Sequence, residues 1–532
     1  MGACGIVYEY TLGALGNNLM GSSHEQIFVI IGLMLFAMGI GSVLQRRLTE
    51  ALIDKFLFLE LLLGLLGGIS VLTIYLTFVY STAHHVVMYS FAVAIGICIG
   101  LEIPLLIRIS NRFALDLRDS LSDILSLDYM GALAGALLFT YVLLTRVSME
   151  RITLLLGSVN TVIGILGLLY FWPMVERKFA LMGLGVAVFF ILIASFAFSP
   201  AWMGALEQRC YRDPIIYSKT SPYQHIVLTK RGERLNLHIN GHLQFSSEDE
   251  RIYHELLVHA PMSVAEKKER VLILGGGDGL ALREVLKYPS SRDVMLVDLD
   301  PVITELSANH PEMIRINEGA FHDARVETKT ADGLTSGERL TLRAPAVRER
   351  SLSRKSPVPI AEVRVLNVDA DLFLRSVVGP FDVVLIDFPD PSSVELAKLY
   401  SVDFFKQLAA RLSRDAVVAI QSTSPFHARE VYLCIGRTLM EAGYRVLPYH
   451  ENVPSFGEWG FYLAWQGGPT PTERLASIRR HSPLPVDTAF LTPRLLCAAF
   501  EFGKGWISFE HIRFNTKMRP MILDYFRKGW QG

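Results

Sequence analysis

The sequence is poor in cysteine, and the cysteines it has are not paired. No C-x-x-C motif is present, because the five stand far apart at Cys4, Cys98, Cys210, Cys434 and Cys497. Zinc sites and disulfide frameworks depend on closely or regularly spaced cysteines. We therefore predict neither, and the pattern fits a reducing compartment.

Histidines do not supply a metal site either. His254 and His259 lie in the stretch His-Glu-Leu-Leu-Val-His, which is similar to a zinc-protease helix. On a helix, residues five apart point about 140° away from each other, whereas residues four apart share a face. The spacing argues against a metalloprotease, and we predict no bound metal.

An excess of charge of one sign is also absent. The chain has 51 Lys and Arg against 52 Asp and Glu, a formal net charge of −1. Proteins that bind nucleic acid usually carry a basic excess, so we predict no nucleic-acid partner. The apolar N-terminal half is not preceded by a basic segment, which argues against a cleaved signal peptide.

Apolar residues, by contrast, are abundant, at 51% of the chain with a mean hydropathy of +0.33. A helix of 18–20 apolar residues crosses a bilayer. Six stretches approach or exceed that length: 25–44, 56–80, 86–107, 129–145, 152–173 and 180–198. Gly2–Met20 is a weaker seventh because it contains Glu9. We predict that residues 1–200 form an all-α transmembrane bundle of six or seven helices in contact with membrane lipid.

Acids inside these stretches are the exception to their apolar character. Glu60 and Glu102 lie within two of them, and Asp128 lies at the edge of a third. Intramembrane acids are costly and often functional. Contact with a cationic solute is one hypothesis, and an interhelical hydrogen bond or an interfacial position is the simpler one.

A nucleoside-binding pattern dominates the rest of the chain. It runs as strand 271–274, a glycine turn with Gly275, Gly277 and Gly279, helix 280–288, strand 294–297 and the acid Asp298. Glycines allow a tight turn and leave room for a ligand at the helix N-terminus. An acid about 20 residues further on binds ribose hydroxyls. The sequence therefore predicts a nucleoside-binding βαβ unit.

Other elements extend this unit into a larger fold. Strands predicted at 363–368, 381–386 and 417–421, with helices between them, indicate a Rossmann-like doubly wound, mostly parallel sheet over 261–470. Residues 221–247, with the turn Asn240-Gly241, predict a small antiparallel β unit within 210–260, followed by a helix at 249–259. Residues 471–532 are assigned as a C-terminal extension.

Five aspartates follow predicted strand ends, namely Asp278, Asp298, Asp369, Asp387 and Asp390. Ligands of such sheets bind beyond the carboxyl ends of the strands. A single aspartate there is usually a helix cap or a turn residue, but five on one rim repel one another unless something cationic lies among them. The implied ligand is a positively charged nucleoside, or a nucleoside with a polyvalent cation. A metal is the less favoured alternative because no His or Cys ligands converge in the sequence.

These residues resemble the spermidine synthase (polyamine aminopropyltransferase) family over about 211–465. The motifs occur in the family's order: Tyr223-Gln224, Gln244, Asp249-Glu250, Tyr253-His254-Glu255, Gly275–Gly279, Asp369-Ala370 and Asp387-x-x-Asp390-Pro391. A hydrophobic multi-span domain ahead of them resembles the membrane-bound bacterial branch.

The resemblance implies transfer of an aminopropyl group from decarboxylated S-adenosylmethionine to a diamine, putrescine, giving spermidine and methylthioadenosine, with no further cofactor. It implies that Asp387 is the general base and that Tyr253 orients the amine. It also implies a set of donor contacts at Gln224, Gly275, Gly277, Asp278, Gly279, Asp298, Asp369 and Ala370. The implied acceptor contacts are Gln244, His254, Asp278, Asp390 and Trp459.

The sequence departs from the family pattern at three places, one of which, the turn Asn240-Gly241 in place of Asp-Gly, should be neutral in effect. Asp298 stands where the family more often has Glu. A stretch rich in Arg, Ser and Pro at about 330–360, predicted as a solvated surface insertion, separates Asp323-Ala-Arg-Val from Asp369-Ala370. Asp332 is therefore a rival for the adenine contact, and we prefer Asp369 because an apolar strand precedes it.

Two other functions fit parts of the sequence. A methyltransferase using ordinary S-adenosylmethionine would also need the glycine turn and Asp298, but Asp278 would repel the carboxylate of that donor. A membrane polyamine transporter or sensor would account for Glu60 and Glu102. Assembly into a homo-oligomer is left open.

The side of the membrane is a separate question. Basic residues cluster near the ends of the spans on one side, at Arg46, Arg47, Lys55, Arg108, Arg112, Arg118, Arg177 and Lys178. The positive-inside rule makes that side cytoplasmic and would leave the soluble half outside. A nucleoside-using enzyme finds its substrate inside the cell. We predict a multi-pass protein of the cell membrane with a cytoplasmic catalytic domain.

Overall fold

The computed structural model describes residues 2–20, 23–111, 117–323, 325–328, 362–377, 379–480 and 484–530. The chain divides into two compact units, Met1–Pro214 and Ile215–Gly532. Each unit has its own hydrophobic core. Asp332 and the insertion predicted at 330–360 lie outside the described residues.

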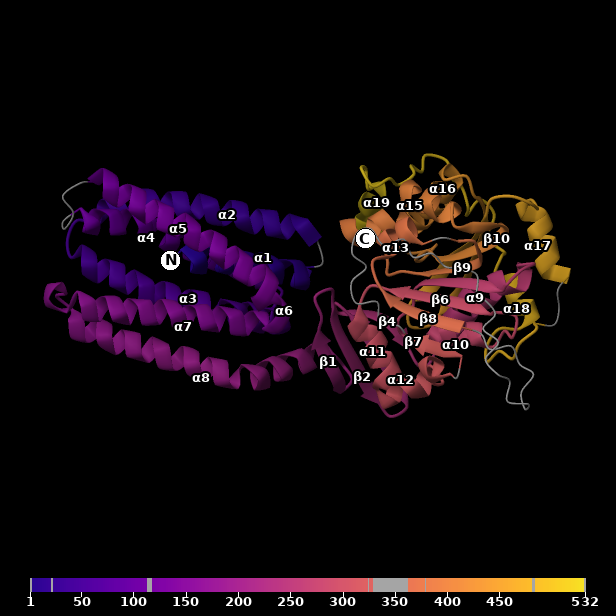
Figure 1. The fold of residues 1–532 in the computed structure, drawn as a ribbon, viewed down its shortest axis with the longest axis horizontal. Helices are drawn as coiled ribbons and strands as arrows, with labels where there is room; N and C mark the ends of the chain where they lie inside the picture. The colour runs from indigo at the N-terminus through magenta and orange to yellow at the C-terminus, as the bar shows by residue number, and fades with distance from the viewer. Residues whose placement is uncertain are drawn as a thin grey trace, which may run out of the picture. The chain divides into compact units, whose positions relative to one another are not determined.

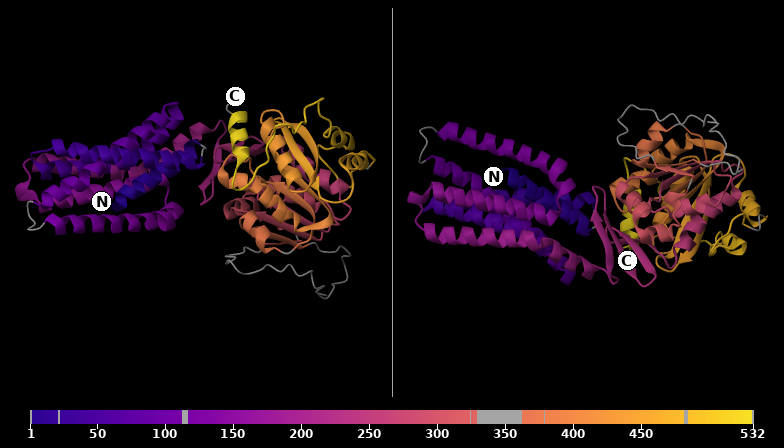
Figure 2. Two further views of the ribbon diagram at one scale, coloured as in Figure 1. Left: turned by 90° about the horizontal axis from the view of Figure 1, so that it is seen from above. Right: turned by 60° about the horizontal axis from the view of Figure 1, so that its bottom comes forward.

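The N-terminal unit consists of helices that lie side by side (Figure 1, Figure 2). They are α1 (Gly2–Met20), α2 (Ser23–Leu44), α3 (Leu52–Tyr80), α4 (His84–Ser110), α5 (Leu117–Leu138), α6 (Leu144–Arg146), α7 (Met149–Tyr170) and α8 (Lys178–Cys210). This confirms the predicted all-α bundle.

Six helical segments in the described part of the chain are long and apolar enough to cross a membrane. They are Gln26–Arg47, Leu52–Tyr80, His84–Ser110, Leu121–Leu143, Met149–Tyr170 and Lys178–Cys210. Gly2–Met20 forms a helix but is not among the six. The structure therefore supports the lower of the two predicted numbers of spans.

Small residues set the spacing between α3 and α7. A Cβ atom added at Gly64 would lie 2.8 Å from the carbonyl oxygen of Gly157, and one added at Gly157 would lie 2.4 Å from that of Gly64. Neither position can hold a larger side chain without moving the helices apart. Small residues at such crossings are typical of membrane helix packing.

The C-terminal unit begins with a four-stranded antiparallel sheet. Its strands, in spatial order, are β1 (Ile215–Thr220), β2 (His225–Arg231), β3 (Arg234–Ile239) and β4 (His242–Ser246). The sheet packs its apolar residues, including Leu237 and Phe245, against Leu280, Ile303 and Met313 of the neighbouring helices. The helix α9 (Glu250–Val264) follows. The small β unit is therefore as predicted, although its first strand begins earlier than residue 221.

The second sheet has eight strands, in the order β11-β12-β10-β9-β5-β6-β8-β7. Their bounds are β5 (Arg270–Gly275), β6 (Asp293–Asp298), β7 (Val326–Thr328), β8 (Glu362–Asn367), β9 (Phe381–Asp387), β10 (Leu412–Gln421), β11 (Arg445–Val453) and β12 (Gly457–Trp465). The pairs from β10 through β7 are parallel, whereas β12 pairs antiparallel with β10 and with β11. This is the predicted doubly wound, mostly parallel sheet.

Helices flank the sheet (Figure 1). They are α10 (Leu280–Leu286), α11 (Pro301–Asn309), α12 (Pro311–Ile316), α13 (Ala370–Ser376), α14 (Val394–Ala397), α15 (Val402–Ala409), α16 (Arg429–Glu441), α17 (Pro471–Arg480), α18 (Pro493–Ala498) and α19 (Met521–Trp530).

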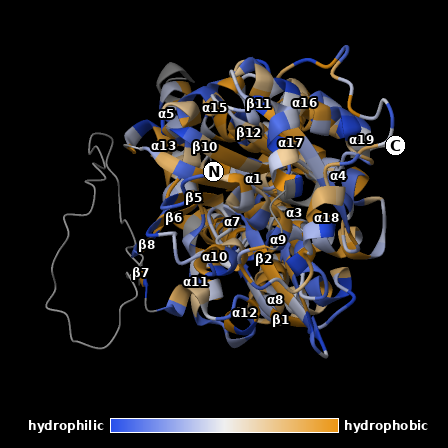
Figure 3. Ribbon diagram, turned by 90° about the vertical axis from the view of Figure 1, so that its right-hand side faces the viewer, coloured by the Kyte–Doolittle hydropathy of each residue, from blue (hydrophilic) through white to orange (hydrophobic). Residues whose placement is uncertain are grey.

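The apolar side chains of the strands pack on both faces of this sheet. On β5, Leu272 and Leu274 belong to one core cluster, while Val271 and Ile273 belong to the other. Successive side chains of a strand point to opposite faces, so a strand covered on both sides reads as an unbroken apolar run. Figure 3 shows hydrophobic colour in the middle of the view, near the labels β10 and β12.

Candidate functional site

The strand order places the candidate site at a point where the chain reverses its direction across the sheet. β5 lies between β6, which follows it in sequence, and β9, which comes later. The register aligns Gly275 with Asp387 and Asp298 with Asn367. Because these strands are parallel, their carboxyl ends share one edge, where open α/β sheets bind ligands. The structure thus brings Asp298, the glycine turn and Asp387 to the same edge.

Close contacts on both sides of the turn leave room only for glycine at these positions. Gly275 and Gly279 have φ values of 84° and 81°, which other residues rarely adopt. A Cβ atom at Gly275 would lie 2.2 Å from the carbonyl oxygen of Asp387, and one at Gly277 would lie 2.7 Å from the carboxylate of Asp298. Side chains here would push the neighbouring acidic residues out of place.

Asp298 holds this turn together. One of its carboxylate oxygens accepts the N–H of Gly277 at 2.9 Å, and the other accepts the N–H of Asp300 at 2.9 Å. Burial raises the pKa of Asp298 to about 6, and these two backbone donors oppose the rise. Asp300 in turn caps α11 and accepts the Ser221 hydroxyl at 2.6 Å, which ties the small sheet to the end of β6.

Asp387, at the end of β9, is held by a tyrosine of α9. Its Oδ1 accepts the phenolic O–H of Tyr253 at 2.5 Å. Burial raises the pKa of Asp387 to about 6, with Asp278 adding to the rise and His254 and Tyr253 opposing it. A carboxylate of this pKa is largely ionised at neutral pH, yet it is a better proton acceptor than an exposed aspartate.

Asp278 lies in the same electrostatic group. Its Oδ1 accepts the N–H of Leu280 at the start of α10. Burial raises the pKa of Asp278, and the nearby His254 opposes the rise. The half-buried carboxylates of Asp278 and Asp387 therefore both interact with one cationic imidazole.

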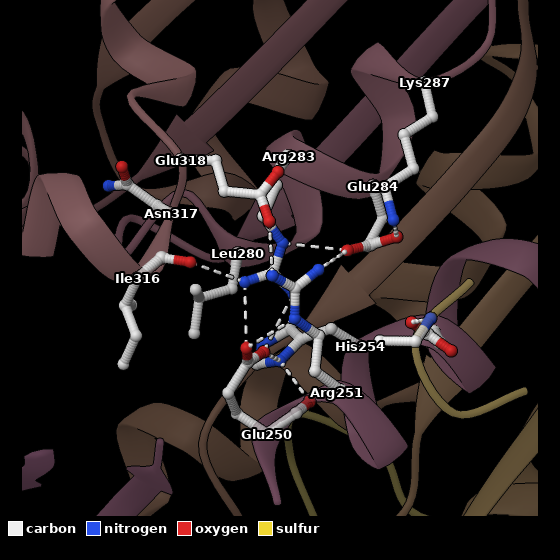
Figure 4. A network of polar contacts seen from close by, with 12 residues as sticks. Glu250, Arg251, His254, Leu280, Arg283, Glu284, Lys287, Ile316, Asn317 and Glu318 are labelled. Carbon is white, nitrogen blue, oxygen red and sulfur yellow. Dashed lines mark hydrogen bonds and ion pairs between the residues drawn. The ribbon is translucent and has the colours of Figure 1, made fainter. Parts of the chain in front are cut away.

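His254 is positively charged because of a network behind it (Figure 4). Burial alone would lower the pKa of His254, but a hydrogen bond of 3.0 Å from Nδ1 to Glu250 raises it to about 9. Arg283, only 4% exposed, holds the same carboxylate through two contacts of 2.8 and 2.9 Å. Glu250 therefore joins two buried cations.

A second acid completes the network in Figure 4. Glu284 accepts from Arg283 at 2.8 Å, Arg251 at 3.1 Å and Lys287 at 2.7 Å. Its other neighbour is His259, whose Nε2 lies 3.0 Å away. His259 thus belongs to a structural ion network of α9 and α10 and does not share a ligand site with His254. This agrees with the spacing argument.

Asp390 is hydrogen-bonded to residues at and just after the end of β10. Its Oδ2 accepts the Thr423 hydroxyl at 3.1 Å, and Gln421 Nε2 lies 3.4 Å from its Oδ1. Burial raises the pKa of Asp390 to about 6, and both partners oppose the rise. Gln421 also donates to the carbonyl of Phe388 at 2.5 Å, so it fixes the loop that carries Asp387 and Asp390.

Asp369 lies beside a cavity of about 490 Å³. Tyr223, Leu299, Leu372, Leu396 and Leu399 provide much of the cavity wall. Asp369 caps α13 by accepting the N–H groups of Asp371 and Leu372, and its other oxygen binds Lys398 Nζ at 2.7 Å. The cavity combines a carboxylate with flat and branched apolar walls, which suits an aromatic base. Ala370 follows as the first residue of α13 and is buried.

Gln224, Gln244 and Trp459 are the remaining predicted residues. Gln224 precedes β2, and its carbonyl accepts the N–H of Ser221 at 2.8 Å. The Gln244 side chain lies on β4, 3.4 Å from the carbonyl of His242. Trp459, on β12, is buried in the same core cluster that Tyr253 packs against, and its ring lies 5.1 Å from that of Phe456.

Sequence reasoning missed the residues that support the carboxylates. Five such residues were not expected. Each contacts an expected residue or the hydrogen-bond partner of one: Arg283, Glu284, Lys398, Gln421 and Thr423. Only Arg283 and Glu284 left a signal, as charged residues inside the otherwise apolar helix Leu280–Leu286. Among the residues that the structure describes, no group of three or more His, Cys, Asp or Glu side chains is arranged to hold a metal ion.

Comparison with known proteins gives consistent matches over the whole chain. The family model described as the spermine/spermidine synthase domain matches residues 250–340 and 356–473. Polyamine aminopropyltransferase 2 of Ralstonia nicotianae is 38% identical over 540 residues, covering 100% of this chain and 96% of the relative. The polyamine aminopropyltransferase of Leptospira interrogans is 39% identical and covers 99% and 96%.

A solved structure matches more distantly. The spermidine synthase of Thermotoga maritima is 20% identical, with a TM-score of 0.42, and the match covers 54% of this chain and 84% of that one. The full-length relatives are similar to both units of this chain, including its helical half.

Proposed function

The chain belongs to the spermine/spermidine synthase family and is an aminopropyltransferase, and we propose that its amine acceptor is putrescine and its products are spermidine and methylthioadenosine. The donor of this family is decarboxylated S-adenosylmethionine. A methyltransferase using the ordinary, carboxylated donor is disfavoured by this family membership and by Asp278.

The transfer needs alignment and a proton acceptor. The lone pair of the amine nitrogen attacks the aminopropyl carbon next to the sulfonium, the C–S bond breaks, and sulfur keeps the electron pair as the thioether of methylthioadenosine. The sulfonium is a good leaving group, so positioning the two substrates provides much of the rate. An amine with a pKa near 10 is mostly protonated at neutral pH, so a base must take up its proton.

We assign the base to Asp387. The observation that carries this assignment is its hydrogen bond with Tyr253. Its carboxylate is half-buried, accepts the Tyr253 hydroxyl at 2.5 Å and has a pKa raised to about 6. Tyr253 helps to orient the amine beside this carboxylate. His254, held as a cation by Glu250, keeps Asp387 ionised at neutral pH although Asp278 lies nearby.

The other roles follow from where each residue lies. Asp278 and Asp390 bind the ammonium groups of donor and acceptor. Asp298 and the N-terminus of α10 receive the ribose. The cavity beside Asp369 and Ala370 receives the adenine, whose amino group would share the carboxylate oxygen that contacts Lys398. Gln224, Gln244, His254 and Trp459 complete the pocket.

The membrane location is proposed on the six apolar helices. We place the protein in the cell membrane, in contact with lipid and with its catalytic unit in the cytoplasm, where nucleoside and polyamine substrates are found. The division into residues 1–200, 210–260, 261–470 and 471–532 is likewise a proposal.

The function is tested by mixing the purified full chain with decarboxylated S-adenosylmethionine and each of putrescine, cadaverine and spermidine. Mass spectrometry should detect spermidine and methylthioadenosine, with putrescine the preferred acceptor by kcat/KM. A preference for cadaverine or spermidine would contradict the acceptor assignment. Absence of methylthioadenosine with every amine would contradict the activity.

A further inference from the structure

The C-terminal extension contacts the walls of the cavity beside Asp369. Two short elements supply much of that wall, namely α13 and the stretch 394–400. Residues 515–517, which lie between α18 and α19, are hydrogen-bonded to both of these elements. The extension, to which the sequence pattern assigns no chemistry, therefore borders the candidate nucleoside site.

The stretch 394–400 is too short to be stable by itself. It consists of α14, with four residues, and a 3₁₀ turn of three residues, Lys398–Tyr400. Helices this short are marginal in water, and the carbonyl groups at a helix end have no partner within the helix. The positions of Leu396, Lys398 and Leu399 in the cavity wall therefore depend on contacts from elsewhere in the chain.

Asn515 supplies such contacts. Its side chain is fully buried, and Nδ2 donates to the carbonyl oxygens of Ala397 at 2.8 Å and Tyr400 at 3.1 Å, which end the two helical pieces. Its own carbonyl accepts the N–H of Val402 at 3.0 Å, and its N–H donates to the hydroxyl of Thr438 on α16 at 2.9 Å. Asn515 is thus bonded to α16 and holds both pieces at their ends.

Lys517 attaches the other element, α13. Its Nζ lies 2.5 Å from Oδ1 of the buried Asp371, two residues after Asp369. Its N–H donates to the carboxylate of Asp403 on α15 at 3.1 Å. Burial opposes ionisation of Asp371, but the hydrogen bond from Lys517 and the other nearby charges outweigh it, so the pKa of Asp371 is lowered. Arg375 also pairs with Asp371, at 2.7 Å, but both lie on α13, so that pair stays within one helix.

We propose that Asn515 and Lys517 are positioning residues for the donor nucleoside, because they hold two walls of this cavity in place before the adenine enters. A pocket whose walls are already ordered binds its ligand more tightly, since binding does not have to order them. The contacts of Lys517 are with Asp371 and Asp403, neither of which is assigned to the amine. Its effect should therefore fall on the donor. The inference rests on the proposed placement of adenine beside Asp369.

The experiment uses the full chain in detergent. Steady-state kinetics give kcat and the KM of the donor and of putrescine, and calorimetry gives the Kd of methylthioadenosine. Lys517→Met should raise the donor KM and the methylthioadenosine Kd about fivefold, the size expected from ordering one or two side chains on binding, while kcat at saturating donor and the putrescine KM stay within about twofold. Lys517→Arg, which keeps the charge, should restore most of the donor affinity.

Arg375→Met is the matched control. It removes the other cation from Asp371 without breaking a connection between α13 and the extension, so the donor KM should match the wild type. Asn515→Asp is the stronger variant, because it replaces two N–H donors by an oxygen that cannot donate while keeping the size. It should raise the donor KM more than Lys517→Met does. Melting temperatures are measured for every variant, and the assays are run well below the lowest of them.

Three results would overturn the proposal. A lower melting temperature for Lys517→Met with unchanged donor KM and methylthioadenosine Kd would show that the extension only stabilises the fold. An equal rise of the donor KM in Arg375→Met would assign the effect to the charge balance of Asp371. Asp369→Asn separates the remaining case: if it weakens methylthioadenosine binding and the variants of Asn515 and Lys517 do not, the positioning role alone fails. If binding is unchanged in all of them, the placement of adenine fails as well.

Discussion

At the scale of single residues, the site depends on carboxylates whose charge is costly to bury. Asp298, Asp387 and Asp390 each have a pKa raised to about 6, with burial as the largest cause. The neighbouring donors, Tyr253, Thr423 and the N–H of Gly277, offset part of that cost. Binding a dication and a sulfonium would offset the rest.

The pH dependence of turnover should report the base. Because Asp387 must be ionised to accept a proton, kcat/KM should fall as the pH is lowered through about 6. The Tyr253 hydrogen bond lowers the pKa of Asp387, so Tyr253→Phe should move the midpoint to higher pH and reduce turnover about tenfold. Tyr444→Phe, a buried tyrosine bonded to the Phe405 carbonyl, should leave the profile unchanged. A Tyr253→Phe midpoint at or below that of the wild type would contradict the assignment.

Stability should respond to pH in the opposite sense to activity. A carboxyl group whose folded-state pKa is raised stabilises the fold below its unfolded pKa of about 3.9, and this contribution is lost as the pH rises through about 6. Asp390→Asn should therefore raise the melting temperature relative to wild type at pH 8 more than at pH 4.5, equivalent to about 1–2 kcal/mol. Equal differences at the two pH values, measured by differential scanning fluorimetry in detergent, would show that burial of charge is not the cause.

At the scale of elements, α9 and α10 are joined by the ion network in Figure 4. Arg283 contacts both Glu250 and Glu284, and all three are buried. Removing one member of a buried network leaves the others uncompensated, which costs about 3–5 kcal/mol. The network also fixes His254, so its loss should reach the active site.

Replacing Arg283 tests this role. Arg283→Leu should destabilise the protein by several kcal/mol and lower turnover, because Glu250 would lose one partner and His254 its fixed position. Arg375→Ala is the control: its guanidinium is 58% exposed and pairs with Asp371, and exposed pairs contribute about 0–1 kcal/mol. Similar melting temperatures for the two variants would refute a special role for the network.

Elements that depend on local sequence patterns could be predicted, whereas contacts between distant segments could not. The parallel strands β5, β6, β8, β9 and β10 and the apolar helices were predictable because apolar runs and their length determine them. The aspartates at strand ends were predictable because parallel strands share one carboxyl edge. The network around Arg283, the support of Asp390 by Thr423 and the pair of Lys398 with Asp369 depend on contacts between distant segments, which a single sequence does not reveal. The strands β11 and β12 were missed because residues 445–465 lack strict alternation.

At the scale of the whole molecule, the catalytic unit should fold without the helical unit. Among the described residues, 215–532 form hydrophobic core clusters of their own. A chain starting at Ile215 should be soluble, melt cooperatively and bind methylthioadenosine with an affinity similar to that of the full chain. Aggregation under all conditions, or loss of a cooperative transition, would contradict independent folding.

The membrane orientation is also a property of the whole chain. A fluorescent protein fused after residue 532 should fluoresce if the catalytic unit is cytoplasmic, whereas an alkaline phosphatase fusion at the same place should be inactive. The opposite pair of results would agree with the positive-inside rule and contradict the location inferred from substrate supply.

The central claim is that Asp387 takes the proton of an amine aligned beside the sulfonium nucleoside. It is tested most directly by single-turnover formation of spermidine by Asp387→Asn, with Asp415→Asn, an exposed aspartate of β10, as the matched control. Methylthioadenosine binding should stay within a few-fold of wild type while the rate falls by 10²-fold or more, and the control should be unaffected. A rate for Asp387→Asn equal to that of the wild type would contradict the claim.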